Sequence, residues 1–433
     1  MSDGSQWWDD RRRDLGEQVA LGAHLARWIV LGAASGALAG VASYAFLEAL
    51  DWATDTRLDT PWLLWLLPLV GLLVGTVYHY LGGRSGEGNS LLLEQIHEPT
   101  AWVPRRMAPL VFAGTVLSHV FGASVGREGT ALQMSGSLTD AIARGLRLAP
   151  VDRRILLIAA LAGGFGSVFG VPLAGAVFAL EVQAIGRVRY EALVPALAAS
   201  VVGDLVVHGL GHDHPVRPQL DVSMDASLLA RLALAGLVFG LASTAFSACT
   251  HGVRHLVTRV PWPPVRPLVG GLATLALVAL VGRDYLGLSL PLIDQALAGQ
   301  SVAGSAFAWK IGFTAIALGC GFPGGEVTPL LVIGATLGAG LATPLGVDGA
   351  LLASVGYVAV FAGAANTPLA CTIMGAELFG AGAMVPVAVG CVVAYVFSSH
   401  RGIYATQRIH TAKGPHPVAG MPTLAEWARR HRP

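Results

Sequence analysis

The chain has 433 residues, of which 54% are hydrophobic and 13% charged, and its net charge is +1. Soluble globular proteins carry roughly 25% charged residues, so this composition argues against a soluble enzyme with an enlarged core. The balanced charge also leaves no basic surface for nucleic acid, and we expect no such partner.

Apolar stretches long enough to cross a bilayer follow one another along most of the chain. They predict an all-α polytopic membrane protein. The stretches lie at 26–50, 62–81, 107–125, 153–180, 190–208, 227–250, 265–282, 329–347, 350–376 and 382–399.

The N-terminal segment, 1–25, is polar and contains Arg11, Arg12 and Arg13. It lacks an early apolar region followed by a small-residue cleavage site, so we do not expect a cleaved signal peptide. The arginines here and in the tail at 401–433 predict that both termini are cytoplasmic and that the number of crossings is even. Arginine is much preferred over lysine, which is typical of GC-rich bacterial genomes. The expected location is therefore the bacterial cytoplasmic (inner) membrane.

An internal repeat divides the chain. The pattern G-x-E-x-T occurs at 126–130 and again at 324–328, with its two glutamates 198 residues apart. In the same way, "VPLAGAVFALE" at 171–181 matches "TPLACTIMGAE" at 367–377 with an offset of 196 residues. Landmarks that recur at nearly one offset predict two related halves. The predicted units are an N-terminal segment at 1–25, a first membrane repeat at 26–208, a linker at 209–226, a second membrane repeat at 227–400 and a short tail at 401–433.

Each G-x-E-x-T motif precedes an apolar run and so predicts a helix N-terminus at membrane depth. Pro329 lies where the first turn of a helix tolerates proline. Free N–H groups and the positive end of the helix dipole make such an N-terminus an anion site. Glu128 and Glu326 would then be resident anions that can leave the site or take up a proton. The alternative is that each carboxylate only caps its own helix.

These motifs resemble those of the CLC family of anion channels and proton-coupled anion antiporters, over nearly all of residues 26–410. "GREGT" is similar to the family's GREGP motif, which makes Glu128 the gating glutamate, and "RGIY" places Tyr404 at the central pore tyrosine. Thr130 replaces the usual proline, "GNSL" replaces the serine loop, and "GGEVTP" replaces a GxFxP-type motif. In combination these departures resemble the fluoride/proton antiporter clade of the family.

The resemblance implies a CLC-type fold, in which two inverted helical repeats bring broken helices to a central anion site. It implies a homodimer with one pore per subunit, no enzymatic activity, and no cofactor or metal. The implied function is a proton-coupled fluoride antiporter that exports fluoride from the cytoplasm. Glu128 and Glu326 would gate the path and carry protons, since Val182 stands where chloride/proton exchangers have an internal glutamate. The anion-binding residues would be Gly126, Arg127, Gly129, Thr130, Gly325, Val327, Thr328, Asn89, Ser90 and Tyr404.

Fluoride is small and strongly hydrated, so a site that dehydrates it needs close, strong hydrogen-bond donors. Helix N-terminal amides, threonine hydroxyls and the Asn89 amide are such donors. A protonated Glu326 could also donate, which would explain a carboxyl group in so apolar a segment.

Two other functions remain open. A chloride channel or chloride/proton exchanger would share the fold but should carry the serine loop and the GxFxP motif. An intramembrane serine hydrolase would use Ser124 of "GASVG" with a histidine such as His119, although we expect His119 to be a hydrogen-bonded helix residue. The cysteines lack metal-ligand spacing, and we expect a solvated loop rather than a metal site at His208, His212 and His214.

Overall fold

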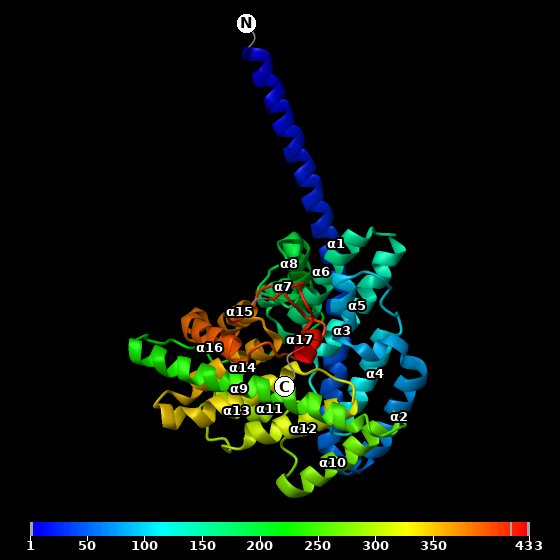
Figure 1. The fold of residues 1–433 in the computed structure, drawn as a ribbon, viewed down its shortest axis with the longest axis vertical. Coiled ribbons are helices and arrows are strands. Elements are labelled where there is room, and N and C mark those ends of the chain that lie inside the picture. Colours follow the sequence, from blue (N-terminus) through cyan, green and yellow to red (C-terminus); the bar gives the residue numbers. More distant parts are fainter. Residues whose placement is uncertain (1–2, 416–417, 431–433) are drawn as a thin grey trace.

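The computed structural model describes residues 3–415 and 418–430, with side chains from residue 16 onward. Helices dominate the described part of the chain (Figure 1). They are α1 (Asp3–Asp59), α2 (Leu67–Val77), α3 (Asn89–His97), α4 (Met107–Val120), α5 (Glu128–Gly145), α6 (Pro150–Phe169), α7 (Pro172–Glu181), α8 (Leu193–Gly209), α9 (Ala226–Val257), α10 (Val265–Val281), α11 (Leu290–Leu297), α12 (Ala306–Cys320), α13 (Val327–Leu345), α14 (Gly349–Ala365), α15 (Pro368–Phe379), α16 (Met384–Phe397) and α17 (Leu424–Arg430). Short 3₁₀ turns cover Pro61–Leu66, Gly83–Glu87, Tyr190–Ala192 and Ala381–Ala383, a π turn covers Tyr78–Gly82, and the strands are β1 (Ala184–Ile185) and β2 (Arg408–Ile409).

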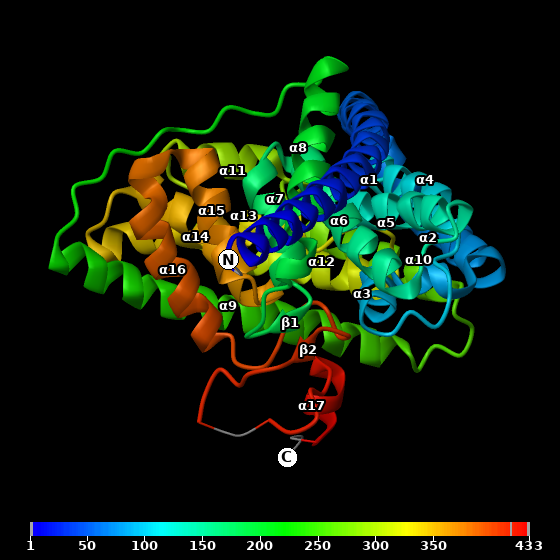
Figure 2. The same ribbon diagram turned by 90° about the horizontal axis from the view of Figure 1, so that it is seen from above.

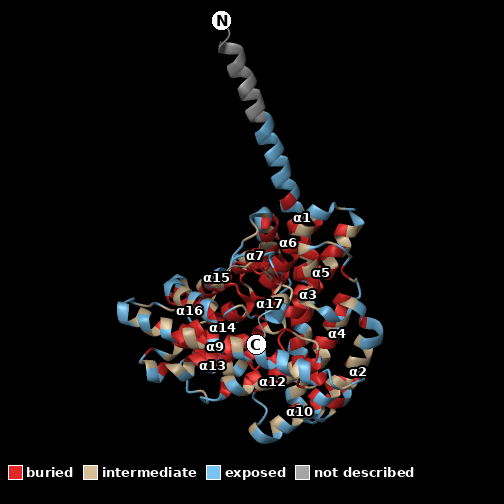
Figure 3. Cartoon of the chain, in the orientation of Figure 1, coloured by how far each residue is buried: buried red, intermediate tan, exposed pale blue. Residues whose placement is uncertain are grey.

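The helix α1 runs without a break through the predicted boundary between the N-terminal segment and the first repeat. Residues 16–20 are exposed and lie on the part of this helix that extends away from the rest of the molecule (Figures 1 and 3). The side chains of Arg11, Arg12 and Arg13, which support the prediction of a cytoplasmic N-terminus, lie outside the described side chains.

Several helical segments are long and apolar enough to cross a membrane. In the described part of the chain they are Gly16–Asp59, Pro61–His97, Tyr190–Gly209, Ala226–Val257 and Val327–Leu345, and shorter apolar helices lie between them. Large apolar side chains on these segments are exposed, as lipid-facing residues are, Leu205 and Leu241 among them.

Two of the predicted apolar stretches are each broken into two helices. The stretch at 153–180 is interrupted between α6 and α7, where Gly170 ends α6 in the left-handed conformation with φ 70°. The stretch at 350–376 is interrupted between α14 and α15, where Asn366 takes the same conformation with φ 59°. In both cases a proline then starts the next helix, since proline is favoured in a helix's first turn and cannot continue the preceding one.

The same packing pattern occurs in both halves of the chain. In the first half α1 packs against α6 and α8, and α5 packs against α6. In the second half α9 packs against α14 and α16, and α13 packs against α14. The halves meet where α2 packs against α10 and α7 against α15. This correspondence supports the two related repeats that the motif offsets predict.

Glycines set the close approach of the paired helices. On α1, a methyl group at Gly32, Gly36 or Gly40 would lie 2.3–2.6 Å from a main-chain oxygen of α8. On α9, a methyl group at Gly240 would lie 2.7 Å from the Ala394 oxygen of α16. These helices therefore meet backbone to backbone, as small residues permit in membrane proteins.

The helices α7 and α15 cap each other through a pair of glutamates. The Glu181 carboxylate at the C-terminal end of α7 accepts hydrogen bonds from two amides in the first turn of α15, at 3.1 and 2.8 Å. The Glu377 carboxylate near the C-terminal end of α15 accepts hydrogen bonds from two amides in the first turn of α7, at 2.9 and 2.8 Å. Each helix thus has its C-terminal part beside the other's N-terminus, so the two run antiparallel and the repeats are inverted.

The C-terminal tail and the linker both fold back onto the helical body. The tail strand β2 pairs in parallel with β1, which directly follows α7, and α17 lies beside this pair (Figure 2). The linker between α8 and α9 runs along the outside of the molecule (Figure 2). The prediction that its histidines are solvated is wrong for His212 and His214, whose side chains are 13% and 10% exposed.

Candidate functional site

The two G-x-E-x-T motifs meet at the centre of the molecule. The Gly126 amide donates to the Gly325 oxygen at 2.6 Å, and the Gly325 amide donates to the Gly126 oxygen at 2.7 Å. A methyl group on Gly325 would lie 2.6 Å from the Gly129 amide nitrogen, so a larger residue does not fit there. Because Glu128 begins α5 and Val327 begins α13, this contact brings two helix N-termini from different repeats together.

Glu128 places its carboxylate on the N-terminus of the opposite repeat's helix. The side chain is fully buried. It accepts hydrogen bonds from the Thr328 amide at 2.9 Å and from the Thr328 hydroxyl at 2.6 Å. The Arg127 guanidinium lies 3.5 Å away, and the Arg127 amide donates at 3.3 Å. The carboxylate therefore occupies the position at which a helix N-terminus binds an anion.

Glu326 lies beside this contact and faces a cavity of about 620 Å³. Asn89, Ser90 and Tyr404 line the same cavity. Asn89 begins α3, so a third helix N-terminus opens onto it. The side-chain nitrogen of Asn89 would lie 3.1 Å from a methyl group on Gly129, which connects the cavity to the N-terminus of α5.

Three buried polar atoms on residues that line the cavity have no hydrogen-bond partner among the described residues. They are the Tyr404 hydroxyl, the Asn89 side-chain oxygen and the Ser85 hydroxyl. Buried polar groups are normally hydrogen-bonded, and each exception requires an explanation. The Tyr404 hydroxyl can donate, so its partner can be an anion or a water molecule.

Two further predicted residues, Thr130 and Ser90, form hydrogen bonds with groups other than the Glu128 carboxylate. The Thr130 hydroxyl pairs with the Thr115 hydroxyl of α4 at 2.8 Å rather than with the Glu128 carboxylate. The Ser90 main-chain oxygen accepts a hydrogen bond from the Thr406 hydroxyl at 3.0 Å. The structure therefore brings Glu128 and Thr328 into direct contact, whereas the Thr130 hydroxyl is hydrogen-bonded to Thr115.

The serine hydrolase alternative receives no support from the geometry. The Ser124 hydroxyl pairs with the Thr314 hydroxyl at 3.0 Å. The Nδ1 atom of His119 donates a hydrogen bond to the main-chain oxygen of Thr115 at 2.8 Å. The two proposed partners are thus hydrogen-bonded to other groups, and His119 is the hydrogen-bonded helix residue that the sequence favoured.

Sequence reasoning missed several polar residues of the cavity. Arg254 near the end of α9, Arg266 near the start of α10 and Gln133 on α5 all line it. The two arginines place positive charge along the cavity, which raises the local concentration of anions. Their position at the ends of apolar stretches was visible in the sequence, but their convergence with Glu326 requires the fold.

Comparison with known proteins is consistent with this geometry. A family model described as voltage gated chloride channel matches residues 70–399, and the chain belongs to this CLC family. The class is an all-α polytopic membrane protein with inverted repeats and a central site at helix N-termini. A "Chloride/fluoride channel protein" of Pseudomonas syringae pv. tomato is 45% identical over 425 residues, covering 96% of this chain and 94% of the relative. The "H(+)/Cl(-) exchange transporter ClcA" of Yersinia pseudotuberculosis is 27% identical over 383 residues, covering 81% and 80%.

Solved structures show the same fold. A crystal structure of a CLC-type fluoride/proton antiporter superimposes with a TM-score of 0.86 at 32% identity, covering 89% of this chain and 98% of the other. A slow cyanobacterial Cl⁻/H⁺ antiporter superimposes with a TM-score of 0.74 at 20% identity, covering 86% and 93%. The family membership and the CLC-type fold that the resemblance implied are therefore confirmed, and the chain is a multi-pass membrane protein.

Proposed function

We propose that this protein is a proton-coupled antiporter that exports fluoride from the cytoplasm across the bacterial inner membrane. The observation that carries the proposal is the buried Glu128 carboxylate, held by Thr328 on the N-terminus of α13. A carboxylate in an anion site competes with a transported anion for the same donors. A proton neutralises the carboxylate and weakens its hold on the helix N-terminus, which frees the site for the anion.

Glu326 and Thr328 supply the features specific to fluoride. The Thr328 hydroxyl, now bonded to Glu128, becomes a donor for fluoride when the carboxyl group leaves. Glu326 adds a second carboxyl group on the cavity side, where a proton can be accepted. Val182 leaves the internal glutamate position of chloride/proton exchangers without an acid, so Glu326 completes the inner proton route.

The names of the similar proteins support fluoride and proton transport to different degrees. The solved structure with the TM-score of 0.86 is a CLC-type fluoride/proton antiporter, and the relative from Pseudomonas syringae is named for both chloride and fluoride. A chloride channel or chloride/proton exchanger is the second candidate, since the similar Yersinia protein exchanges chloride with protons. The cavity lining favours fluoride, because "GNSL" and "GGEVTP" replace the chloride-type motifs there.

The placement of the cavity supports the direction of export that we propose. The linker contacts Glu48 near the C-terminal end of α1, through a hydrogen bond from His212 at 3.0 Å. The linker joins α9 at its N-terminal end, whereas the cavity lies at its C-terminal end, where Val257 and Thr258 line it. With a cytoplasmic N-terminus the linker is outside, and the cavity with Arg254 and Arg266 opens toward the cytoplasm. Anions are thus gathered from the side on which fluoride must be removed.

The protein is further proposed to be a homodimer with one pore per subunit. Leu173 on α7 and Leu369 on α15 are each 52% exposed at equivalent positions of the two repeats, on helices that pack against each other. This arrangement presents one apolar surface built by both repeats, suited to a second copy. Cross-linking of the purified protein in mild detergent should capture dimers, and capture of monomers alone would count against the proposal.

A flux assay in liposomes tests the transport function. Purified protein should exchange fluoride for protons far faster than chloride, measured with a fluoride electrode and an internal pH dye. Glu128→Gln keeps the size of the side chain but fixes it in the neutral state, so fluoride gradients should no longer move protons. Glu17→Gln, at an exposed position on the extension of α1, serves as the matched control. Chloride flux as fast as fluoride flux in the unmutated protein would refute the fluoride assignment.

A further inference from the structure

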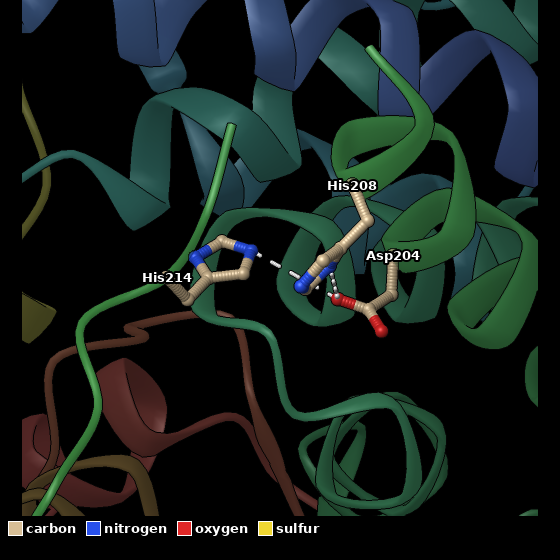
Figure 4. A group of neighbouring side chains, drawn as sticks. All are labelled: Asp204, His208 and His214. Atoms are coloured by element: carbon tan, nitrogen blue, oxygen red, sulfur yellow. Dashed lines mark ion pairs between the residues drawn. The ribbon is translucent and has the colours of Figure 1, made fainter. Parts of the chain in front are cut away.

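Three ionisable side chains converge where the linker between the repeats begins. Asp204 and His208 lie one turn apart on α8, and His214 follows in the linker (Figure 4). The linker folds back so that the His214 ring points toward the other two side chains (Figure 4). None of these three residues lines the cavity that Glu326 faces.

The distances are close to those of a metal site. One possible ligand atom from each side chain lies within 4.8 Å of the other two. Asp204 Oδ1 lies 3.7 Å from His208 Nδ1 and 3.8 Å from His214 Nε2. Ligand atoms bound at about 2.0–2.2 Å in a tetrahedron are about 3.3–3.6 Å apart. Small rotations of the side chains would therefore bring all three onto one ion.

Two of these atoms are buried polar atoms without a hydrogen bond in the described part of the chain. Asp204 Oδ1 and His214 Nε2 are buried and have no hydrogen-bond partner among the described residues. The His214 side chain is only 10% exposed. A buried ring nitrogen and a buried carboxylate oxygen aimed at each other without a hydrogen bond are costly unless something binds between them.

The charge around the group favours a cation. Asp213 lies 3.7 Å from His208 Nε2, and Glu48 accepts from the neighbouring His212.

We propose that Asp204, His208 and His214 bind a divalent transition-metal ion, zinc by the chemistry of the ligands, and that this ion fastens the linker to α8. Two imidazoles and one carboxylate are ligands that zinc accepts, with water in the fourth position. Magnesium and calcium prefer oxygen ligands, so they are expected to bind poorly. Asp213 would accept from the second ring nitrogen of His208 and orient the ring, as carboxylates commonly do for metal-bound histidines.

A metal ion at this site would connect the linker to the turn between α6 and α7 as well as to α8. His214 packs against the turn between α6 and α7, because a methyl group on Gly170 would lie 2.4 Å from its ring. A bound ion would therefore tie the linker, α8 and the turn between α6 and α7 together. The linker carries no helix between Gly209 and Ala226, so a fixed point near its start restricts its motion.

Zinc binding to the purified full-length protein tests the proposal. Isothermal titration in detergent should give one zinc per chain, and zinc should raise Tm whereas magnesium should not. His214→Gln and Asp204→Asn should each weaken zinc binding by at least about 100-fold, and Asp213→Asn by about 10- to 100-fold. His255→Gln is the matched control, since His255 is exposed on α9 and belongs to neither candidate metal-binding group.

Each contrary outcome would overturn the assignment. Unmutated protein that shows neither heat of zinc binding nor a zinc-dependent rise in Tm would have no such site. An equal rise in Tm with magnesium would indicate non-specific screening of surface carboxylates. His212 forms a second candidate group with Glu48 and Asp51, so a loss of binding in His212→Gln as large as in His214→Gln would place the ion there instead. Hydrogen exchange of linker amides gives a second readout, and zinc should slow it in the unmutated protein but not in His214→Gln.

Discussion

The contact between Thr328 and Glu128 offers the sharpest test of the gate. Thr328→Val removes the hydroxyl that donates to the Glu128 carboxylate at 2.6 Å and keeps the main-chain donor at 2.9 Å. The side-chain volume is nearly unchanged. The substitution therefore isolates one hydrogen bond to a buried charge.

The size of the effect follows from this geometry. A hydrogen bond to a charged group contributes about 1.5–3 kcal/mol. Since about 1.4 kcal/mol corresponds to a factor of ten, its loss should shift the balance from the occupied toward the vacated gate by about 10- to 150-fold. Fluoride loses the same donor, so proton-coupled fluoride flux should fall and an uncoupled component should appear.

The assay is simultaneous recording of fluoride efflux and internal pH in liposomes. Thr130→Val is the matched control, because it is the same change in the equivalent motif but its hydroxyl bonds Thr115 instead of Glu128. It should lose some stability and keep its coupling. Unchanged coupling and rate in Thr328→Val would refute the role of Thr328, and a coupling loss in Thr130→Val would show that the Thr130 hydroxyl also takes part.

Three further predictions concern the cavity and the repeat contact. Glu326→Gln should strongly reduce proton-coupled fluoride flux with normal expression, because it removes a protonatable group at constant size; wild-type flux would reduce Glu326 to a helix cap. Tyr404→Phe removes a buried hydroxyl that has no hydrogen-bond partner among the described residues, so fluoride turnover should fall while Tm is maintained. Unchanged turnover would mean that the tyrosine serves only in packing. Glu181→Gln and Glu377→Gln should each lower stability by about 1–2 kcal/mol through weaker capping, measured as a loss of Tm. If the repeats are inverted as described, the two losses should be similar, and a loss in only one variant would contradict the reciprocal contact.

Much of the fold and site was predictable from the sequence because these features are local. Long apolar stretches in a chain with few charges leave only a polytopic helical membrane protein. Glycine before a carboxylate and an apolar run marks a helix N-terminus, and the recurrence of G-x-E-x-T at 126–130 and 324–328 marks a repeat. These rules depend on neighbouring residues, so they can be read without the fold.

The tertiary structure decided which atoms meet. The sequence placed Glu128 and Thr328 in separate motifs, and only the inverted packing of the repeats puts the carboxylate of one on the helix N-terminus of the other. The tertiary structure also determines that the Thr130 hydroxyl is hydrogen-bonded to Thr115 and that His214 is buried beside Asp204. Contacts between residues some 200 positions apart depend on how helices cross and how closely their glycines let them approach, and local sequence does not encode that geometry.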